Sequence, residues 1–182
     1  MNSRIPLVSA TDTPAASRAT LDAVHGAFGA TPNMFRAVAN SPAALQAMWS
    51  FFGALGGGSI PARLGEQIAV AVADRNACEY CLAAHTALGR KAGASAAEMS
   101  AAQAGESADP AAATALRFAL QLVEQRGQVG DADVAALRAV GFGDGQIVEI
   151  LAHVALNLFT NYVNVAFAVP VDFPGVKLRS AT

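Results

Sequence analysis

The chain has 182 residues, of which 53% are hydrophobic and only 14% charged, and its formal net charge is −2. This length suits one domain with a sizeable hydrophobic core. A pI near 5.9 and the lack of any basic cluster exclude the charge pattern of a nucleic-acid-binding protein. Because so few charges would leave apolar surface exposed on a lone subunit, we expect a homo-oligomer.

The N-terminal residues 1–14 read MNSRIPLVSATDTP and lack the apolar core of a secretory signal peptide. We therefore expect the protein in the cytoplasm. The chain has two cysteines, Cys78 and Cys81, only three positions apart. In a reducing compartment such a pair indicates catalysis or metal binding and not a structural disulfide.

A threonine or serine followed by proline marks the first three helix starts, at Thr13-Pro14, Thr31-Pro32 and Ser41-Pro42. The hydroxyl suits the N-cap, and proline suits the first helical position. Gly29 is expected to end the first helix, and the glycines at 56–58 the third.

The middle of the chain predicts two further helices that flank the cysteines. Pro61 begins a helix that contains Glu66. The next helix is expected to begin near Asn76 or Ala77, which would place both cysteines in its first turns, and to end at Gly93.

Ser95 and Glu98 form a capping-box pattern for a short helix.

No stretch alternates apolar and polar residues at period two, so the predicted fold class is all-α. The last three helices are expected to start at aspartates, with each aspartate as the cap: Asp109, Asp131 and Asp144.

The last predicted helix, from Asp144 to about Ala168, is long enough and apolar enough to raise the question of a membrane span. It also carries polar residues, mostly four positions apart, which would be costly in hydrocarbon. A buried helix with one hydrogen-bonded polar stripe explains this pattern, and we expect no membrane contact. The polar residues are Glu149, His153, Asn157, Asn161 and Asn164.

Around the cysteines the chain reads E-x11-C-x2-C-x3-H, formed by Glu66, Cys78, Cys81 and His85. Two thiols three positions apart can close and reopen a disulfide, and a helix N-terminus stabilises a thiolate. His85 lies four positions after Cys81, on the same helix face and within reach for proton exchange. Glu66 must reach this group from the preceding helix, where its carboxylate can orient His85.

This pattern resembles that of the AhpD-like alkylhydroperoxidases of the carboxymuconolactone decarboxylase superfamily. The resemblance assigns Glu66 as the relay glutamate, Cys78 and Cys81 as the redox cysteines and His85 as the histidine of the site. The C-terminal run from Gly141 is similar to the ending of the longer peroxidase-related members, so the resemblance covers most of the chain.

The resemblance implies a single AhpD-like domain over residues 1–182, a bundle of about eight helices with two related halves, assembled as a homotrimer or homohexamer. One position departs from the family pattern. Tyr80 stands where the mycobacterial-type AhpD has a second histidine, just before the second cysteine, which predicts a simpler proton relay.

The function implied is a thiol-dependent peroxidase that reduces alkyl hydroperoxides and needs no cofactor or metal. A thiolate attacks the peroxide and becomes a sulfenic acid, the other cysteine captures it as a disulfide, and an external dithiol restores the thiols. Because His85 is one turn from Cys81 and two from Cys78, and because the resemblance agrees, we expect Cys81 to attack and Cys78 to resolve.

The motif spacing recurs further along the chain as Glu149-x11-Asn161-x2-Asn164-x3-Ala168. We interpret residues of about 31–105 as the redox half and about 110–170 as a degenerate second half. Asparagine keeps hydrogen bonds in a buried helix but has no redox chemistry, so this half is expected to be scaffold and interface.

Two other functions fit parts of the pattern. One is a lyase like carboxymuconolactone decarboxylase itself, although such members generally lack the cysteine pair. The other is a non-enzymatic zinc module with Cys78, Cys81 and His85 as ligands and Glu66 as a fourth. Structural zinc sites more often bring two separated ligand pairs, and the chain has no second pair.

Overall fold

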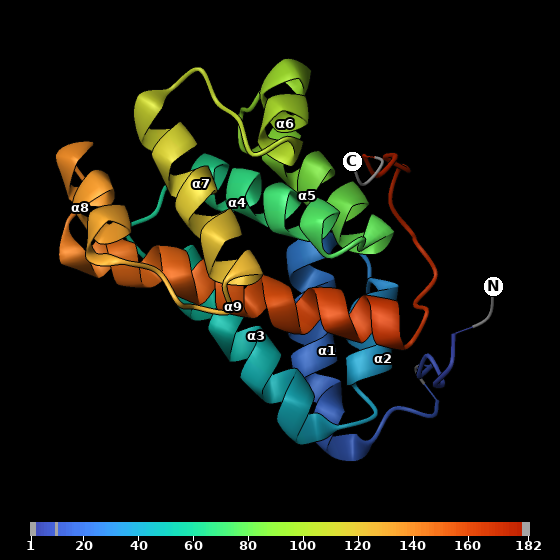
Figure 1. Cartoon of the computed structure of the whole chain (residues 1–182). Helices are drawn as coiled ribbons and strands as arrows, with labels where there is room; N and C mark the ends of the chain where they lie inside the picture. The colour runs from blue at the N-terminus through green and yellow to red at the C-terminus, as the bar shows by residue number, and fades with distance from the viewer. Residues whose placement is uncertain (1–2, 10, 180–182) are drawn as a thin grey trace.

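The computed structural model describes residues 3–9 and 11–179, and within them it contains nine α-helices and no strand (Figure 1). The predicted all-α class is confirmed. The helices are α1 (Ala15–Phe28), α2 (Asn33–Val38), α3 (Pro42–Gly56), α4 (Ala62–Arg75), α5 (Glu79–Lys91), α6 (Ala96–Gln103), α7 (Pro110–Glu124), α8 (Asp131–Ala139) and α9 (Asp144–Ala166).

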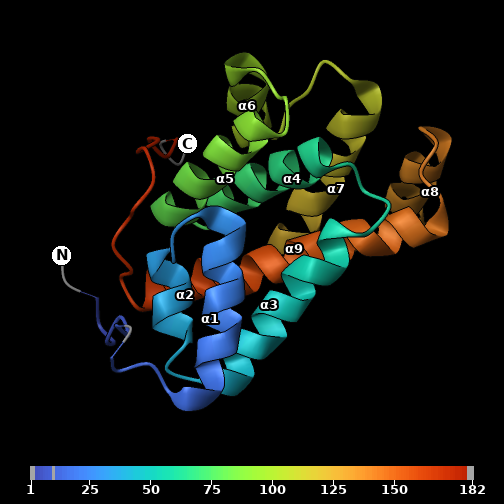
Figure 2. The same ribbon diagram turned by 180° about the vertical axis from the view of Figure 1, so that it is seen from behind.

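Helix α9 crosses the middle of the molecule, with α4 to α7 on one side and α1 to α3 on the other (Figures 1 and 2). Helix α4 is the most enclosed element, because it packs against α5, α6, α7 and α9. Its residues from Leu64 to Ala73 are buried with one exception, Glu66. Most of them are alanine or valine, whose small side chains let four helices approach one axis.

The caps expected at Thr13 and Thr31 are wrong, because Pro14 and Pro32 occupy the N-cap positions of α1 and α2, but other predicted caps are present. Ser41 Oγ accepts from the Ala44 N–H, and the Asp109 carboxylate accepts from the first N–H groups of α7. Gly29, at φ 74°, ends α1 in the left-handed conformation.

The caps expected at Asp131 and Asp144 are wrong by one position, because each aspartate is the first helical residue. Gly130 and Gly143 occupy the N-cap positions. The N–H of Gly130 donates to the Asp133 carboxylate, and the N–H of Gly143 donates to the side-chain oxygen of Gln146. The carboxylates of Asp131 and Asp144 instead lie where the helix dipole favours negative charge.

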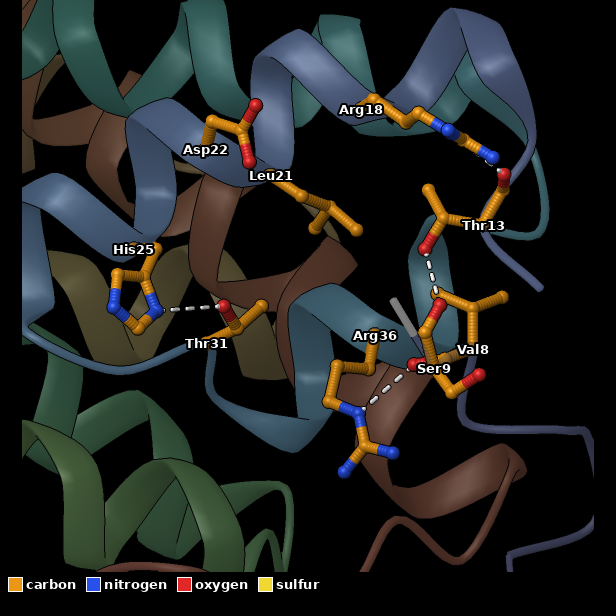
Figure 3. A pocket seen from close by; sticks show the side chains of 9 residues that line it. All are labelled: Val8, Ser9, Thr13, Arg18, Leu21, Asp22, His25, Thr31 and Arg36. Atoms are coloured by element: carbon orange, nitrogen blue, oxygen red, sulfur yellow. Dashed lines mark hydrogen bonds between the residues drawn. The ribbon is translucent and has the colours of Figure 1, made fainter. Parts of the chain in front are cut away.

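The N-terminal segment lies along α1 and α2 (Figure 3). Arg36 Nε donates to the Val8 carbonyl, and the Thr13 hydroxyl donates to the Ser9 carbonyl. His25 shares a hydrogen bond with the Thr31 hydroxyl at 3.3 Å. These contacts enclose a surface hollow of about 600 Å³ that contains no cysteine.

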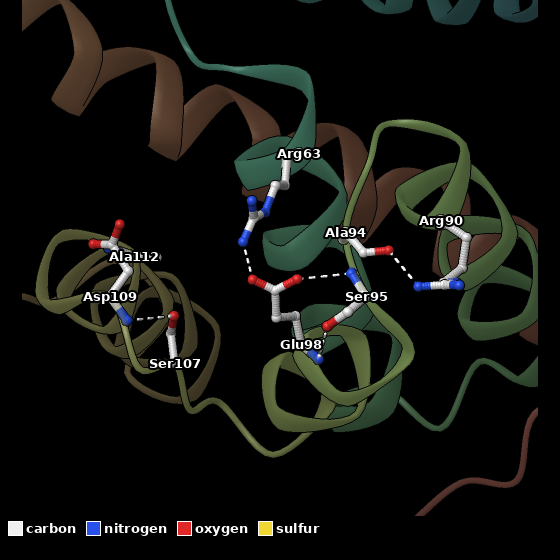
Figure 4. A network of polar contacts seen from close by, with 8 residues as sticks. All are labelled: Arg63, Arg90, Ala94, Ser95, Glu98, Ser107, Asp109 and Ala112. Atoms are coloured by element: carbon white, nitrogen blue, oxygen red, sulfur yellow. Dashed lines mark hydrogen bonds and ion pairs between the residues drawn. The ribbon is translucent and has the colours of Figure 1, made fainter.

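The predicted capping box of Ser95 and Glu98 is confirmed (Figure 4). Glu98 also pairs with Arg63 of α4, and Arg90 of α5 donates to the Ala94 carbonyl. The short helix α6 packs against both α4 and α5, which carry the E-x11-C-x2-C-x3-H residues.

No single helix of the described chain is long and apolar enough to cross a membrane, although α8 and α9 pass that test as a pair bent by 116°. The polar stripe predicted for α9 is largely buried, including Asn157, Asn161 and Asn164. The Asn157 amide donates to the carbonyl one turn earlier, and Asn161 Oδ1 accepts from Asn76 at 2.9 Å.

Candidate redox site

The corner between α4 and α5 sets the position of the first cysteine. Ala77 takes φ +53°, which breaks the helix, and the extended Cys78 follows as the N-cap of α5. Helix α5 therefore begins at Glu79, later than the expected start at Asn76 or Ala77. The Cys78 sulfur accepts from the Cys81 N–H at 3.2 Å, so a thiol does what a capping hydroxyl usually does.

Cys81 lies in the first turn of α5 and is held from α9. Its sulfur accepts a hydrogen bond from Asn164 Nδ2 at 3.1 Å. Both cysteines are buried free thiols, at 1% and 2% exposure. The second half was expected to be scaffold and interface, and its Asn164 in addition contacts a thiol directly.

His85 and Glu66 form a close pair between α5 and α4. The distance from His85 Nδ1 to Glu66 Oε2 is 2.7 Å, and the side chains are 13% and 23% exposed. Burial opposes the charging of His85, but the charge and hydrogen bond of Glu66 prevail and raise the pKa of His85. The pair can therefore hold a proton next to the thiols.

The two thiols are not equivalent. Although burial works against it, the hydrogen bond with Cys78, the charge of His85 and the amide of Asn164 lower the pKa of Cys81 to about 7. Hydrogen bonding to Cys81 and burial raise the pKa of Cys78. Of the two thiols, Cys81 is therefore the one that ionises more readily, and a thiolate is the nucleophilic form of cysteine.

The two thiols also line different cavities. Cys81 shares with His85 a small apolar cavity of about 40 Å³ that Cys78 does not line. Cys78 lines a hollow of about 470 Å³ between the start of α5, the end of α9 and the C-terminal segment. The aromatic residues around the Cys81 cavity are Phe28, Phe35, Phe52, Tyr80 and Phe173.

Tyr80 lines the cavity at Cys81. Its hydroxyl accepts from the Met34 N–H at 3.2 Å, and its ring packs edge-on against Phe173. Burial raises the pKa of Tyr80, so its hydroxyl stays neutral. The position that the resemblance would give to a histidine is thus filled by an uncharged side chain, as a simpler relay requires.

His153 of α9 is a site residue that the sequence did not single out. It lines a cavity of about 150 Å³ together with Glu66, His85 and Asn157. Gly65 makes room for it, since a Cβ there would lie 3.0 Å from the imidazole. Burial lowers the pKa of His153, and its Nε2 and Asn157 Oδ1 have no partner among the described residues.

The only signal for His153 in the sequence was its place in the polar stripe of α9. Within the described chain, no three histidine, cysteine, aspartate or glutamate side chains are placed to hold a metal ion. The described residues therefore do not form the ligand set that the zinc module would need.

A model of the carboxymuconolactone decarboxylase family matches residues 42–125, a range that holds Glu66, Cys78, Cys81 and His85. No curated protein matches the chain. The chain is similar to the alkylhydroperoxidase AhpD core, an uncharacterized peroxidase-related protein from Ralstonia eutropha JMP134, with 27% identity, 93% and 92% of the two chains covered and a TM-score of 0.82.

An uncharacterized peroxidase-related protein from Silicibacter sp. TM1040 is similar at 25% identity, with 92% and 91% coverage and a TM-score of 0.81. The debrominase Bmp8 has a TM-score of 0.79 over 94% of both chains, but at 20% identity this likeness shows the fold alone. The predicted AhpD-like fold is confirmed by these matches.

Proposed function

The chain belongs to the carboxymuconolactone decarboxylase family and has the AhpD-like fold, and we propose that it is a thiol-dependent oxidoreductase that reduces alkyl hydroperoxides. One observation carries the proposal: Cys81 and His85 line one apolar cavity, and Glu66 holds His85 at 2.7 Å. A nucleophile, a proton donor and an apolar binding surface thus lie together.

The first step takes place at Cys81. Its thiolate attacks the terminal peroxide oxygen, so that an S–O bond forms and the O–O bond breaks. The leaving alkoxide takes a proton from His85 and departs as the alcohol, while the charge of Glu66 keeps His85 protonated beforehand. The aromatic residues that line the cavity suit contact with the organic group of an alkyl hydroperoxide.

Cys78 then resolves the sulfenic acid. Its sulfur, which already lies beside the Cys81 N–H, attacks the Cys81 sulfur; an S–S bond forms, and the hydroxyl leaves as water with the proton of Cys78. An external dithiol completes the cycle, becoming a disulfide as it restores both thiols.

The proposal is tested with the reduced protein and cumene hydroperoxide, by counting thiols lost and alcohol formed. We expect two thiols lost and one alcohol released for each hydroperoxide consumed. Thiol loss without stoichiometric alcohol, or no loss at all, would contradict a peroxidase function.

We also propose that copies of this chain associate through α9. Large apolar side chains recur on one exposed face of this helix at spacings of three or four, or multiples of these. A face of this kind favours a homo-oligomer, a trimer or hexamer by family resemblance, and sedimentation at micromolar concentration checks it: monomer alone would contradict it. The residues are Val148, Leu151, Phe159, Tyr162 and Val165.

A further inference from the structure

We propose that the cavity of about 150 Å³ beside His85 receives the organic group of the hydroperoxide, and that Asn157 and His153 bind a hydroxyl group on it. The inference rests on the proposed peroxidase function and names the substrate class of that site: an alkyl hydroperoxide of about six carbons that carries a hydroxyl group. Cys81 lines the smaller neighbouring cavity, where the peroxide group reacts.

The cavity at Cys81 is too small to hold a whole alkyl hydroperoxide. It measures about 40 Å³. Since a water molecule takes up about 30 Å³ in the liquid, this space holds little more than the two peroxide oxygens. The aromatic residues around it can contact the carbon next to the peroxide, but the rest of the organic group needs a second space.

A second cavity adjoins the first. His85 and Phe52 line both cavities, so these two side chains form the boundary between them. The second cavity measures about 150 Å³, a size that accommodates about one benzene-sized group. A hydroperoxide whose O–O bond lies at Cys81 can therefore extend past His85 into it. Its large apolar lining residues are Phe52, Leu55, Ile60 and Leu156.

Two buried polar atoms of this second cavity have no partner among the described residues, namely Asn157 Oδ1 and His153 Nε2. Asn157 is 4% exposed, and its Nδ2 donates to the His153 carbonyl at 2.9 Å, which leaves Oδ1 as the free atom of the amide. The two residues lie one turn apart on α9, so their side chains share one helix face. A buried acceptor without a donor is costly, and a ligand that supplies the donor removes this cost.

A hydroxyl group matches both free atoms. It can donate to Asn157 Oδ1 and at the same time accept from His153 Nε2 when that nitrogen carries the proton. A carboxylate matches them less well. Burial lowers the pKa of His153, which is therefore neutral, and the positive charge of His85 is already paired with Glu66. A second anion in this cavity would lose its hydration without gaining a cation.

The second cavity also has a way in from the surface. Gly56 and Ala62 line it and are exposed, at the end of α3 and the start of α4. Gly65 leaves room for the imidazole of His153, since a Cβ at this glycine would lie 3.0 Å from the ring. A hydroperoxide can enter here with its peroxide end first and leave its hydroxyl end beside Asn157.

The redox step at Cys81 then proceeds with the substrate held at both ends. The thiolate bonds to the terminal peroxide oxygen, the O–O bond breaks, and the alkoxide takes the proton of His85. Cys81 is oxidised to a sulfenic acid, and the hydroperoxide is reduced to a diol. A site that binds a substrate hydroxyl discriminates against the analogue without it, because its own polar atoms are then left unpaired.

The test compares tert-hexyl hydroperoxide with its analogue that carries a hydroxyl group at the end of the longest carbon chain. Stopped-flow thiol oxidation gives a second-order rate constant for each. We expect the wild-type protein to prefer the hydroxylated compound at least about tenfold. In Asn157→Leu this ratio should fall to about one, and the ratio cancels any general loss of activity.

Asn164→Leu is the matched control on the same helix. Asn164 contacts the Cys81 sulfur and does not line this cavity, so both rates should fall while their ratio stays as in wild type. A wild-type ratio near one would overturn the proposal, because water and not the substrate would then satisfy Asn157. A ratio that Asn157→Leu leaves unchanged would overturn the assignment of the hydroxyl site.

Binding is measured separately, without any reaction. The diol formed from the hydroxylated hydroperoxide is added to the reduced wild-type protein, and the ring resonances of its three histidines are followed by NMR. We expect the resonances of His153 to shift and those of His25, in the hollow beside the N-terminal segment, to stay. If His153 shifts but neither hydroperoxide oxidises a thiol, the peroxidase function fails and the binding site stands. If both hydroperoxides react equally and His153 does not shift, the function stands and the binding site fails.

Discussion

Two stretches of this chain share one residue spacing but fold differently. Glu66 to His85 forms two helices with a break at Ala77, whereas the stretch 83 residues later, Glu149 to Ala168, runs through α9 without a break almost to its end. The break places a cysteine at a helix N-cap and turns the next helix back against α4. A continuous helix at that point could not bring Glu66 and His85 together.

Corresponding positions of the two stretches also have different roles. Glu66 holds His85, whereas Glu149 Oε2 accepts the N–H groups of Ser59 and Ile60, just before α4 begins. Cys81 and Asn164 occupy corresponding positions and are hydrogen-bonded to each other. The second stretch thus contributes a donor to the site of the first, and a shared spacing did not imply a shared function.

The largest expected effect separates the two cysteines within the first stretch. Cys81→Ser removes the stabilised thiolate, so we expect no sulfenic acid and no turnover. Cys78→Ser should still form a sulfenic acid, which a dimedone-type reagent traps on Cys81. Labelling of Cys78 in the Cys81→Ser variant, with none in the reverse case, would exchange the two roles.

The next effect compares the two glutamates. Glu66→Gln removes the charge that keeps His85 protonated and should slow the peroxide step by about a hundredfold, the size expected for a lost acid–base group. With less charge on His85, the pKa of Cys81 should rise above its value of about 7. Stopped-flow measurement of the rate at different pH values checks both expectations. The wild-type rate should fall as pH drops below about 7, and in the variant this fall should occur at a higher pH.

Glu149→Gln is the matched control, because Glu149 contacts backbone and not a thiol. Hydrogen bonds from the Ser59 and Ile60 backbone lower the pKa of Glu149 below its ordinary 4.5. Its charge therefore adds stability above pH 4.5, and this contribution is lost as pH falls further. We expect normal activity from the folded variant, and a stability difference from wild type that vanishes in acid. Loss of activity in well-folded protein would contradict this division of roles.

A smaller effect is expected where the two stretches meet. Asn164→Leu removes the donor to Cys81, and a hydrogen bond to a charged group is typically worth about 1.5–3 kcal/mol. The pKa of Cys81 should rise, so that the peroxide step slows by about tenfold or more at pH 7 and recovers as pH increases. A loss that is constant across pH would indicate damaged packing instead.

The sequence predicted what depends on local chemistry. The Ser41 and Asp109 caps, the Ser95–Glu98 box and the helix end at Gly29 involve residues only a few positions apart. Spacing and resemblance also pointed to the four motif residues, which the fold brings close to one another; their catalytic roles stay a prediction.

What the sequence did not predict depends on packing between distant helices. Neither the contact of Asn164 with Cys81 nor the place of His153 beside Glu66 follows from any local pattern, since both require the position of α9 relative to α4 and α5. The later start of α5 was missed for a similar reason: alanine rarely adopts positive φ, so nothing local marks Ala77 as the break.

The smallest expected effects test that break directly, with glycine at corresponding positions of the two stretches. Ala77 bears the cost of a left-handed backbone, about 1–2 kcal/mol for an L-residue, so Ala77→Gly should stabilise the protein by about 0.5–1 kcal/mol after the larger entropy of the unfolded chain is counted. Thr160, 83 residues later, is buried inside α9, where Thr160→Gly should destabilise by at least about 1 kcal/mol. Thermal unfolding at one protein concentration should therefore shift in opposite directions, by a few degrees each. If both variants lose stability equally, the left-handed break at Ala77 is not the difference that separates the two stretches.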